Sequence, residues 1–233
     1  LFIFHEDSQS GAPNALLTFL KFLKETHAKD LLVDIYVMNP FGELEQQLNE
    51  VSSNFYKKSK KKTFFGKMFK ALQSDIHDLV KKNKYDMIYG NTIVTLDLLS
   101  EIKNKNAQSK TFIHVHESQF LCSQFLDQNK AIKQFQNVDH ILAVSKLSGN
   151  NLIENYKVSA DKIFIIPPTI KEEEFIVDTT IKDSYKDFDL VLVTIGHPNL
   201  TKGSDLLPQI ANVLRERNPN LKFKILLIGV RYD

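Results

Sequence analysis

Short apolar runs alternate with longer, helix-like segments along most of this chain. Runs such as "ILAV" at 141–144 and "IFII" at 163–166 are continuously apolar or β-branched. Continuous runs of this kind are typical of strands that are buried on both faces, whereas half-buried strands alternate polar and apolar residues. A parallel sheet with helices on both sides buries its strands in this way. The alternation therefore predicts an α/β fold with a doubly wound parallel sheet.

The same pattern gives bounds for the elements of this sheet. Strands are expected at 1–4, 31–38, 86–89, 111–115, 140–144 and 162–166. Helices are expected at 13–26, 43–51, 64–82, 94–103, 130–136 and 146–156. Ser10 suits the cap of the first helix and Pro13 suits its first turn.

A charged segment with two prolines, "PPTIKEEEFIVDTTIKDSYKDFD" at 167–189, interrupts the alternation. We expect a first domain at 1–168, a linker at 169–188 and the start of a second α/β unit at 189–233. In this second unit, strands are expected at 190–195 and 223–228, with a helix at 205–217. One strand–helix–strand unit of about 45 residues is too small for a stable domain. We therefore expect the second domain to continue beyond Asp233.

Composition excludes several other classes of protein. The formal charge of +2 gives no indication of a nucleic-acid partner. No apolar run approaches the roughly 20 residues that span a bilayer. The single cysteine, Cys122, cannot form an internal disulfide, which fits a cytoplasmic protein. Because the chain opens with Leu1 inside an apolar run, we treat its start as trimmed.

Two polar loops follow expected strand ends, where open parallel sheets bind their ligands. In "HEDSQSGAPNALL", Gly11 precedes a helix whose N-terminus can receive a phosphate. A simple strand-to-helix turn explains the same pattern. In "DMIYGNT", Asn91 can cap the following helix, or it can face a polar ligand in the same cleft.

Two histidines lie in the expected strand of "TFIHVHES". We expect His114 and His116 to point to opposite faces of the sheet, so that only His116 faces a cleft at the strand end. There its imidazole can hydrogen-bond a substrate hydroxyl or phosphate, or transfer a proton. We do not expect the two histidines to share a metal ion. Two structurally satisfied histidines are the alternative.

The loop "GHPNLTKGSDLL" at 196–207 opens the second unit. Gly196 ends a strand, and Lys202 and Gly203 lie at the start of a helix. A lysine in this position can neutralise a diphosphate. The GxxxxGK order of a P-loop is absent, and a merely solvated lysine is the alternative.

Seven lysines and no acidic residue lie between Lys57 and Lys70, beside bulky apolar residues such as Phe64 and Phe65. Basic and apolar side chains together suit the surface of an anionic membrane. A basic loop followed by a buried helix face is the alternative. The residues expected to face the membrane are Lys57, Lys58, Lys60, Lys61 and Lys62.

Taken together, these segments resemble the family-four glycosyltransferases, which have two facing Rossmann-like domains in the GT-B arrangement. The matching segments run in family order: "SQSGAPNALL", "YDMIYGNT", "HVHES", "VDHILAVSKLSGNNLIENYKVSADKIFIIPPTI" and "LVTIGHPNLTKGSDLL". The resemblance covers essentially the whole chain, which would hold the acceptor-side domain and the start of the nucleotide-sugar domain.

The resemblance implies a role for individual residues. His116 matches the cleft histidine that contacts the donor sugar. Gly11 and Ala12 would approach the donor diphosphate, and Lys202 would bind its phosphates together with Gly196, His197 and Gly203. Asn91 and Glu117 are assigned to the acceptor side.

The implied reaction is sugar transfer from a nucleotide sugar, with retention at the anomeric carbon and without a metal or other cofactor. The acceptor would be a glycan, a lipid-linked glycan or a protein. The enzyme would be cytoplasmic, either free or bound peripherally at the inner face of the membrane. The paired glutamates of the family would lie beyond Asp233, so we expect this fragment alone to be inactive.

Besides the missing glutamates, a second departure from the family keeps other functions open. His197 stands where family members usually carry arginine, and it is a weaker, titratable partner for a phosphate. A non-catalytic protein with the same fold is therefore an alternative, as is a membrane-binding module. A Rossmann oxidoreductase fits less well, because GxGxxG does not follow the first strand.

Overall fold

The computed structural model describes residues 1–27, 29–58, 68–105, 108–169, 184–196, 198 and 202–229, with the side chains of 68–75 left out. The chain divides into two compact units, Leu1–Ile170 and Lys171–Asp233. Each is described by itself below.

The first unit is built on a seven-stranded sheet in which every pair of neighbouring strands is parallel. The strand order is β3-β2-β1-β4-β5-β6-β7, so the chain winds outward from β1 in both directions. The strands are β1 (Phe2–Glu6), β2 (Asp34–Asn39), β3 (Asn54–Lys57), β4 (Met87–Asn91), β5 (Lys110–Val115), β6 (His140–Ala143) and β7 (Ile163–Ile165). This is the doubly wound topology that the apolar runs predict.

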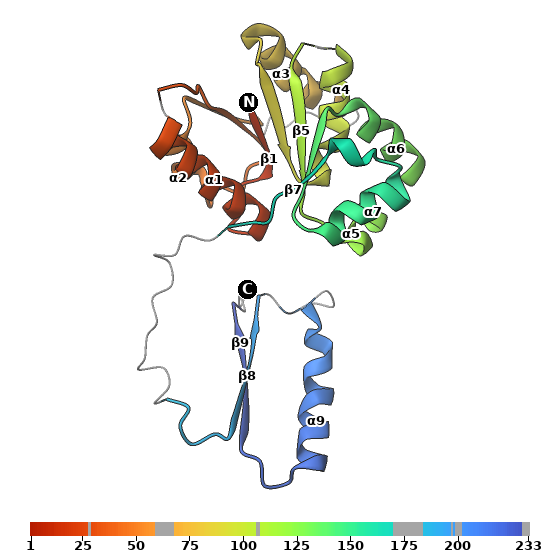
Figure 1. The fold of residues 1–233 in the computed structure, drawn as a ribbon. Helices are drawn as coiled ribbons and strands as arrows, with labels where there is room; N and C mark the ends of the chain where they lie inside the picture. Colours follow the sequence, from red (N-terminus) through yellow and green to blue (C-terminus); the bar gives the residue numbers. More distant parts are fainter. Residues whose placement is uncertain are drawn as a thin grey trace. The chain divides into compact units, whose positions relative to one another are not determined.

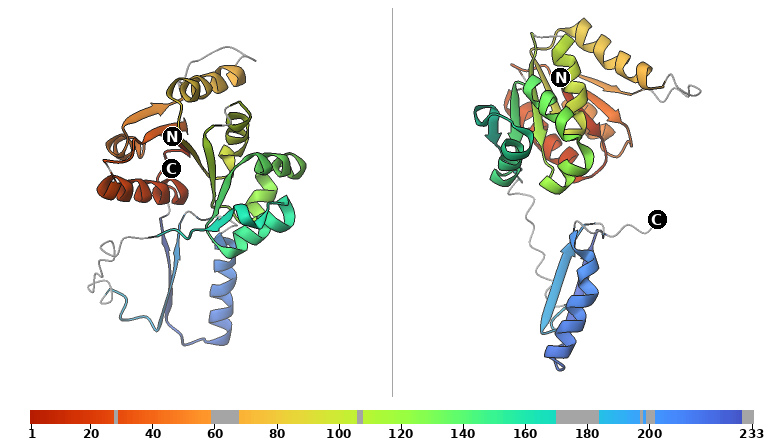
Figure 2. Two further views of the ribbon diagram at one scale, coloured as in Figure 1. Left: turned by 45° about the horizontal axis from the view of Figure 1, so that its top comes forward. Right: turned by 90° about the vertical axis from the view of Figure 1, so that its right-hand side faces the viewer.

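Helices cover both faces of this sheet (Figure 1). One face packs against α1 (Gly11–His27) and α2 (Glu45–Val51), with Leu16, Leu20 and Leu48 fully buried between them and the strands. The other face packs against the remaining helices of the unit, which Figure 2 shows on the opposite side. These are α3 (Met68–Asn83), α4 (Leu96–Lys105), α5 (Gln119–Phe125), α6 (Gln128–Asn137) and α7 (Lys146–Tyr156), joined by the short 3-10 helices η1 (Ile93–Thr95) and η2 (Ala160–Lys162).

Several expected bounds are wrong in informative ways. The second strand begins at Asp34, not Leu31, because Leu31 and Leu32 are exposed. The edge strand β3 and the helix α5 were not expected. The residues of β3 are only half buried or exposed, and Cys122 is the buried residue of α5, so neither has a clear apolar pattern. The remaining strands and helices match the expected order.

The second unit contains two parallel strands, β8 (Leu190–Ile195) and β9 (Phe223–Ile228), with the expected bounds. They are connected through η5 (Ser204–Leu206) and α9 (Leu207–Arg217), which begins two residues later than expected. Figure 1 shows α9 running beside the two strands.

Much of the lysine-rich stretch lies outside the described residues, including Lys60, Lys61 and Lys62. Lys57 ends the edge strand β3, and its ammonium group lies 2.6 Å from the Glu45 carboxylate. The backbone N–H of Lys58 donates to Val37. Within the described part of the chain, no helix is long and apolar enough to cross a membrane.

Candidate functional site

The carboxyl ends of β1, β4 and β5 lie side by side in the sheet, since Phe4 is paired with Asn91 and Asn91 with His114. Asn91 is fully buried at this edge. Its amide nitrogen donates to the carbonyl oxygen of Ala12 at 3.0 Å, and its amide oxygen lies 3.0 Å from Nε2 of His116. One side chain therefore joins the N-terminus of α1 to the end of β5. Asn91 does not cap the helix that follows it.

The expectation that His114 and His116 point to opposite faces is wrong. Residues two apart in a strand share a face, and the two imidazole rings are 4.1 Å apart between centroids. His114 also accepts or donates a hydrogen bond at Nδ1, 2.7 Å from the hydroxyl of Tyr89. Both histidines thus belong to one cluster at the sheet edge, with Asn91 at one end and Tyr89 at the other.

Burial keeps this histidine cluster uncharged. Desolvation lowers the pKa of His114 to about 4. Desolvation, reinforced by the neighbouring His114 and His5, lowers the pKa of His116 to about 3. Desolvation also lowers the pKa of His5, which lies in β1 directly after three buried residues. At neutral pH, His116 is therefore a polar, neutral group and a poor proton donor.

Glu117 organises the backbone beside His116. Its carboxylate accepts from the N–H of His116 at 3.0 Å and from the N–H of Ile93 at 3.3 Å, the first residue of η1. Burial raises the pKa of Glu117, against the lowering effect of these donors. The carboxylate therefore ties the end of β5 to the turn after β4, and this contact accounts for Glu117 within the unit.

The turn between Asn91 and η1 is strained. Thr92 has φ 78° and ψ 159°, a conformation that glycine adopts readily and a β-branched residue rarely does. Its N–H donates to the carbonyl of His114 at 2.8 Å, and its carbonyl accepts from the hydroxyl of Thr95 at 2.8 Å. Strain held by surrounding contacts is common at functional sites.

Gly11 begins α1, and the space around it is open. A Cβ added there would have no atom within 4 Å. Packing therefore does not explain the glycine, whereas close approach of a ligand would. The first N–H groups of a helix have no partner within the helix, and they carry a partial positive charge. N–H groups of this kind are favourable partners for an anion.

Three carboxylates that the sequence motifs did not single out fix the loop before α1. Glu6 accepts from the hydroxyls of Ser8 and Ser10, and the carbonyl oxygen of Ser10 accepts from the N–H of Asn14 in α1. Asp7 is fully buried and accepts from the N–H of Gly42 at 3.0 Å. Glu43 accepts from the N–H of Gln9 at 2.6 Å. The run "HEDS" after a strand was the available signal for Glu6 and Asp7, but the contacts of Asp7 with Gly42 and of Glu43 with Gln9 join residues about 35 positions apart.

In the second unit, glycines and a lysine meet at the carboxyl ends of β8 and β9. Gly196 has φ +107°, and a Cβ on it would lie 3.6 Å from Cε of Lys202. Gly229 packs against Gly196, since a Cβ there would be 3.5 Å from the Cα of Gly196. Gly203, with φ +66°, precedes η5. His197 lies outside the described residues.

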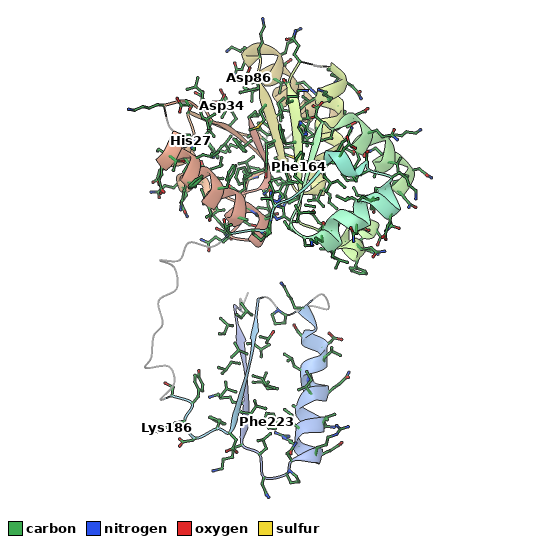
Figure 3. The ribbon with its side chains drawn as sticks, in the orientation of Figure 1. His27, Asp34, Asp86, Phe164, Lys186 and Phe223 are labelled. Carbon is green, nitrogen blue, oxygen red and sulfur yellow. The ribbon has the colours of Figure 1, made fainter. Side chains whose placement is uncertain are left out.

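Other features of the described residues do not mark a site as clearly. No group of three or more His, Cys, Asp or Glu side chains among them has the geometry to hold a metal ion. Cavities of about 420 and 600 Å³ open beside Asp86 and Asp34. Figure 3 shows both residues at the opposite, amino edge of the sheet. Ligands of open parallel sheets bind at the carboxyl edge, so volume alone does not identify the site.

Solved structures place this architecture among known folds. HepE from Anabaena, solved in complex with UDP and glucose, is similar to this chain with a TM-score of 0.62 and 12% sequence identity. The match covers 100% of this chain and 70% of HepE. The lipopolysaccharide outer core galactosyltransferase WaaB covers 100% of the chain with 61% of its length, at a TM-score of 0.67 and 13% identity. The first unit has the Rossmann-like fold of a GT-B glycosyltransferase domain.

The GT-B fold is shared with enzymes that do not transfer sugars. UDP-GlcNAc 2-epimerase from Neisseria meningitidis, solved with UDP-GlcNAc, covers 97% of the chain with 65% of its length, at a TM-score of 0.55 and 16% identity. Fold likeness at such low identity therefore leaves the reaction open.

Sequence comparisons are weaker. No protein-family model matches the chain. The GPI3 component of the Saccharomyces cerevisiae phosphatidylinositol N-acetylglucosaminyltransferase is 29% identical over 41% of the chain. One component of an ATP-dependent helicase/nuclease from Clostridium botulinum is 25% identical over 82% of it. The chain matches only 22% and 14% of these two proteins' lengths, respectively.

Proposed function

We propose that this chain is part of a glycosyltransferase that takes a sugar from a nucleotide-sugar donor. The observation that carries the proposal is the link made by Asn91, which joins the open N-terminus of α1 to the neutral imidazole of His116 at the carboxyl edge of the sheet. In a GT-B fold this edge is the ligand side. Solved relatives of the same fold hold UDP, UDP-glucose or UDP-GlcNAc.

In this proposal the backbone N–H groups at Gly11 and Ala12 bind the donor diphosphate. Lys202, Gly196, Gly203 and His197 are the other residues proposed to bind it. Glu6 and Asp7 place negative charge in the loop before α1. The N-terminus of α1 supplies only about half a positive charge. A cation from elsewhere is therefore needed to balance a diphosphate, and Lys202 is our candidate.

The proposed reaction retains the configuration of the anomeric carbon. The bond between that carbon and the leaving phosphate oxygen breaks, and the acceptor oxygen bonds to the same face of the sugar. The acceptor's proton passes to the departing phosphate oxygen. The protein's part is to stabilise the negative charge that grows on this phosphate. His116 contacts the sugar as a neutral group, and no metal takes part.

The acceptor is proposed to lie beside Asn91 and Glu117. A cavity of about 350 Å³ opens next to this point, between η1 and the helices α5 and α6. Ile93, whose N–H binds Glu117, lines it together with the exposed ring of Phe125 and the paired side chains of Asp97 and Lys130. Apolar and charged groups side by side suit a glycan, including one attached to a lipid or a protein.

Two other functions are kept as alternatives. Epimerisation of a UDP-sugar is favoured by the epimerase neighbours of the same fold. A non-catalytic binding protein is favoured by His197 in place of the arginine usual in the resembling family. The helicase/nuclease match does not add a third alternative. The sequence has no GxxxxGK loop, with which many nucleotide hydrolases hold phosphate.

The test is product analysis with the full-length protein. UDP-glucose and UDP-GlcNAc are incubated with candidate glycan acceptors, and the anomeric protons are followed by NMR. We expect a new glycosidic bond of the donor's own anomeric configuration, and a loss of donor affinity of about tenfold or more in Lys202→Ala. Inversion at C2 without transfer would support the epimerase instead, and binding without turnover would support the non-catalytic protein.

A further inference from the structure

The orientation of the Asn91 side chain is fixed by its partner on α1. The amide atom that faces the carbonyl oxygen of Ala12 lies 3.0 Å from it. A carbonyl oxygen can only accept a hydrogen bond, so this atom must be the amide nitrogen. The amide oxygen consequently points to His116. Asn91 is fully buried, and turning the amide over would place two oxygens against each other.

This orientation decides which nitrogen of His116 carries hydrogen. Nε2 lies 3.0 Å from the amide oxygen of Asn91, which can only accept. Nε2 must therefore be protonated. In a neutral imidazole the other nitrogen, Nδ1, then has a lone pair and no hydrogen. Nδ1 has no hydrogen-bond partner among the described residues, and His116 as a whole is partly exposed.

We propose that Asn91 is a positioning residue that holds His116 as the neutral tautomer with hydrogen on Nε2, so that Nδ1 is presented to the ligand as a hydrogen-bond acceptor. Resting on the proposed function, the ligand group that meets Nδ1 is a hydroxyl of the sugar, which donates its hydrogen. His116 then selects for a hydroxyl and against a group that can only accept. It neither donates to the sugar nor transfers a proton to it.

The surroundings of the ring support a neutral state. The rings of His114 and His116 lie 4.1 Å apart between centroids with their planes tilted by 41°, and Nδ1 of His114 is hydrogen-bonded to the hydroxyl of Tyr89. If both rings were protonated, two positive charges would repel each other at this short distance. The carboxylate of the adjacent Glu117 accepts from backbone N–H groups, including that of His116.

The tautomer is measured directly by ¹⁵N NMR of this chain with labelled histidine at pH 7. We expect His116 to show protonated Nε2 and unprotonated Nδ1, and Asn91→Leu to shift it toward a mixture of tautomers. Asn151→Leu is the matched control: Asn151 is buried in α7 and bonds to Asn155. It should leave the His116 signals unchanged.

Three outcomes would overturn the proposal. They are hydrogen on Nδ1 in the wild-type protein, an imidazolium at pH 7, and an unchanged tautomer in a folded Asn91→Leu variant. If that variant does not fold, the wild-type spectrum decides by itself.

The acceptor role is tested with donor analogues in the full-length protein. UDP-glucose is compared with analogues in which one hydroxyl is replaced by hydrogen or by fluorine, which cannot donate. At the hydroxyl that meets His116, both replacements should weaken binding equally, by about 3- to 10-fold, and His116→Ala should abolish the difference from UDP-glucose. Tolerance of fluorine but not of hydrogen would contradict an acceptor at Nδ1. Failure of UDP-glucose and UDP-GlcNAc to bind at all would contradict the proposed function and leave the tautomer result standing.

Discussion

Replacement of Gly90 by alanine tests how tightly the strand that carries Asn91 is packed. A Cβ at position 90 would lie 2.3 Å from Oγ1 of Thr95 and 2.5 Å from Cδ1 of Leu99. Both neighbours are fully buried. The hydroxyl of Thr95 is also held by the carbonyl of Thr92, at 2.8 Å. Neither side chain can therefore move aside at low cost.

The magnitude follows from these contacts. Forcing an extra methyl group into a packed core costs about 1–3 kcal/mol, and breaking the Thr95 hydrogen bond adds about 1 kcal/mol. We expect Gly90→Ala to lower the free energy of unfolding by roughly 2–4 kcal/mol. For a unit of this size, that is a fall in Tm of roughly 4–16 °C.

Differential scanning calorimetry measures this shift, and Gly11→Ala is the matched control. Gly11 has open space around it, so alanine there should leave Tm unchanged or raise it slightly. In Gly90→Ala combined with Thr95→Ala, the losses should be less than additive, because the main clash is gone. A Gly90→Ala protein as stable as wild type would refute the packing described for this strand.

The remaining predictions concern pH, strain and membranes. Because burial lowers the pKa of His114 to about 4 and of His116 to about 3, the unfolded chain takes up protons below about pH 6.5 that the folded chain does not. Stability should fall from pH 6.5 toward 4, by roughly 2 kcal/mol per histidine at pH 5. Glu117, with its raised pKa, acts in the opposite direction. Urea unfolding of His114→Gln should show a weaker pH dependence than wild type, and equal slopes would contradict the pKa shift. Thr92→Gly should stabilise the protein by about 1 kcal/mol in urea, since glycine relieves the strained backbone; a destabilised variant would argue against strain. Through the stretch 57–70, the protein should sediment with anionic vesicles at low salt. Each lysine near the surface should contribute about 1 kcal/mol to the binding free energy. Equal binding to neutral vesicles would exclude this role.

The fold of the first unit was largely predictable because its strands are continuous apolar runs. The core strands β4, β5 and β6 are mostly buried, and each contains a short run of apolar residues that reveals it. The edge strand β3 escaped prediction for the opposite reason. Its residues, "NFYK", are half buried or exposed, so nothing in their order distinguishes them from a loop.

The site was predictable only in its parts. Strand ends drew attention to Gly11, Asn91 and His116, and Asn91 does contact Ala12 and His116. Their connection was not visible, because Asn91 meets Ala12 across 79 residues and His116 across 25. Local pattern suggested a helix cap for Asn91, but the tertiary contacts use both ends of its amide. The faces of His114 and His116 were misjudged, because the period of a strand places residues two apart on the same face.

The central claim is that the carboxyl edge of the sheet binds a nucleotide sugar, and NMR titration of the ¹⁵N-labelled full-length protein tests it most directly. UDP-glucose and UDP-GlcNAc are added while the backbone amides and the Asn91 side chain are followed. We predict saturable shifts concentrated at Gly11, Ala12, His116 and the Asn91 amide. The absence of binding by both donors, or shifts confined to the amino edge around Asp34 and Asp86, would contradict the account.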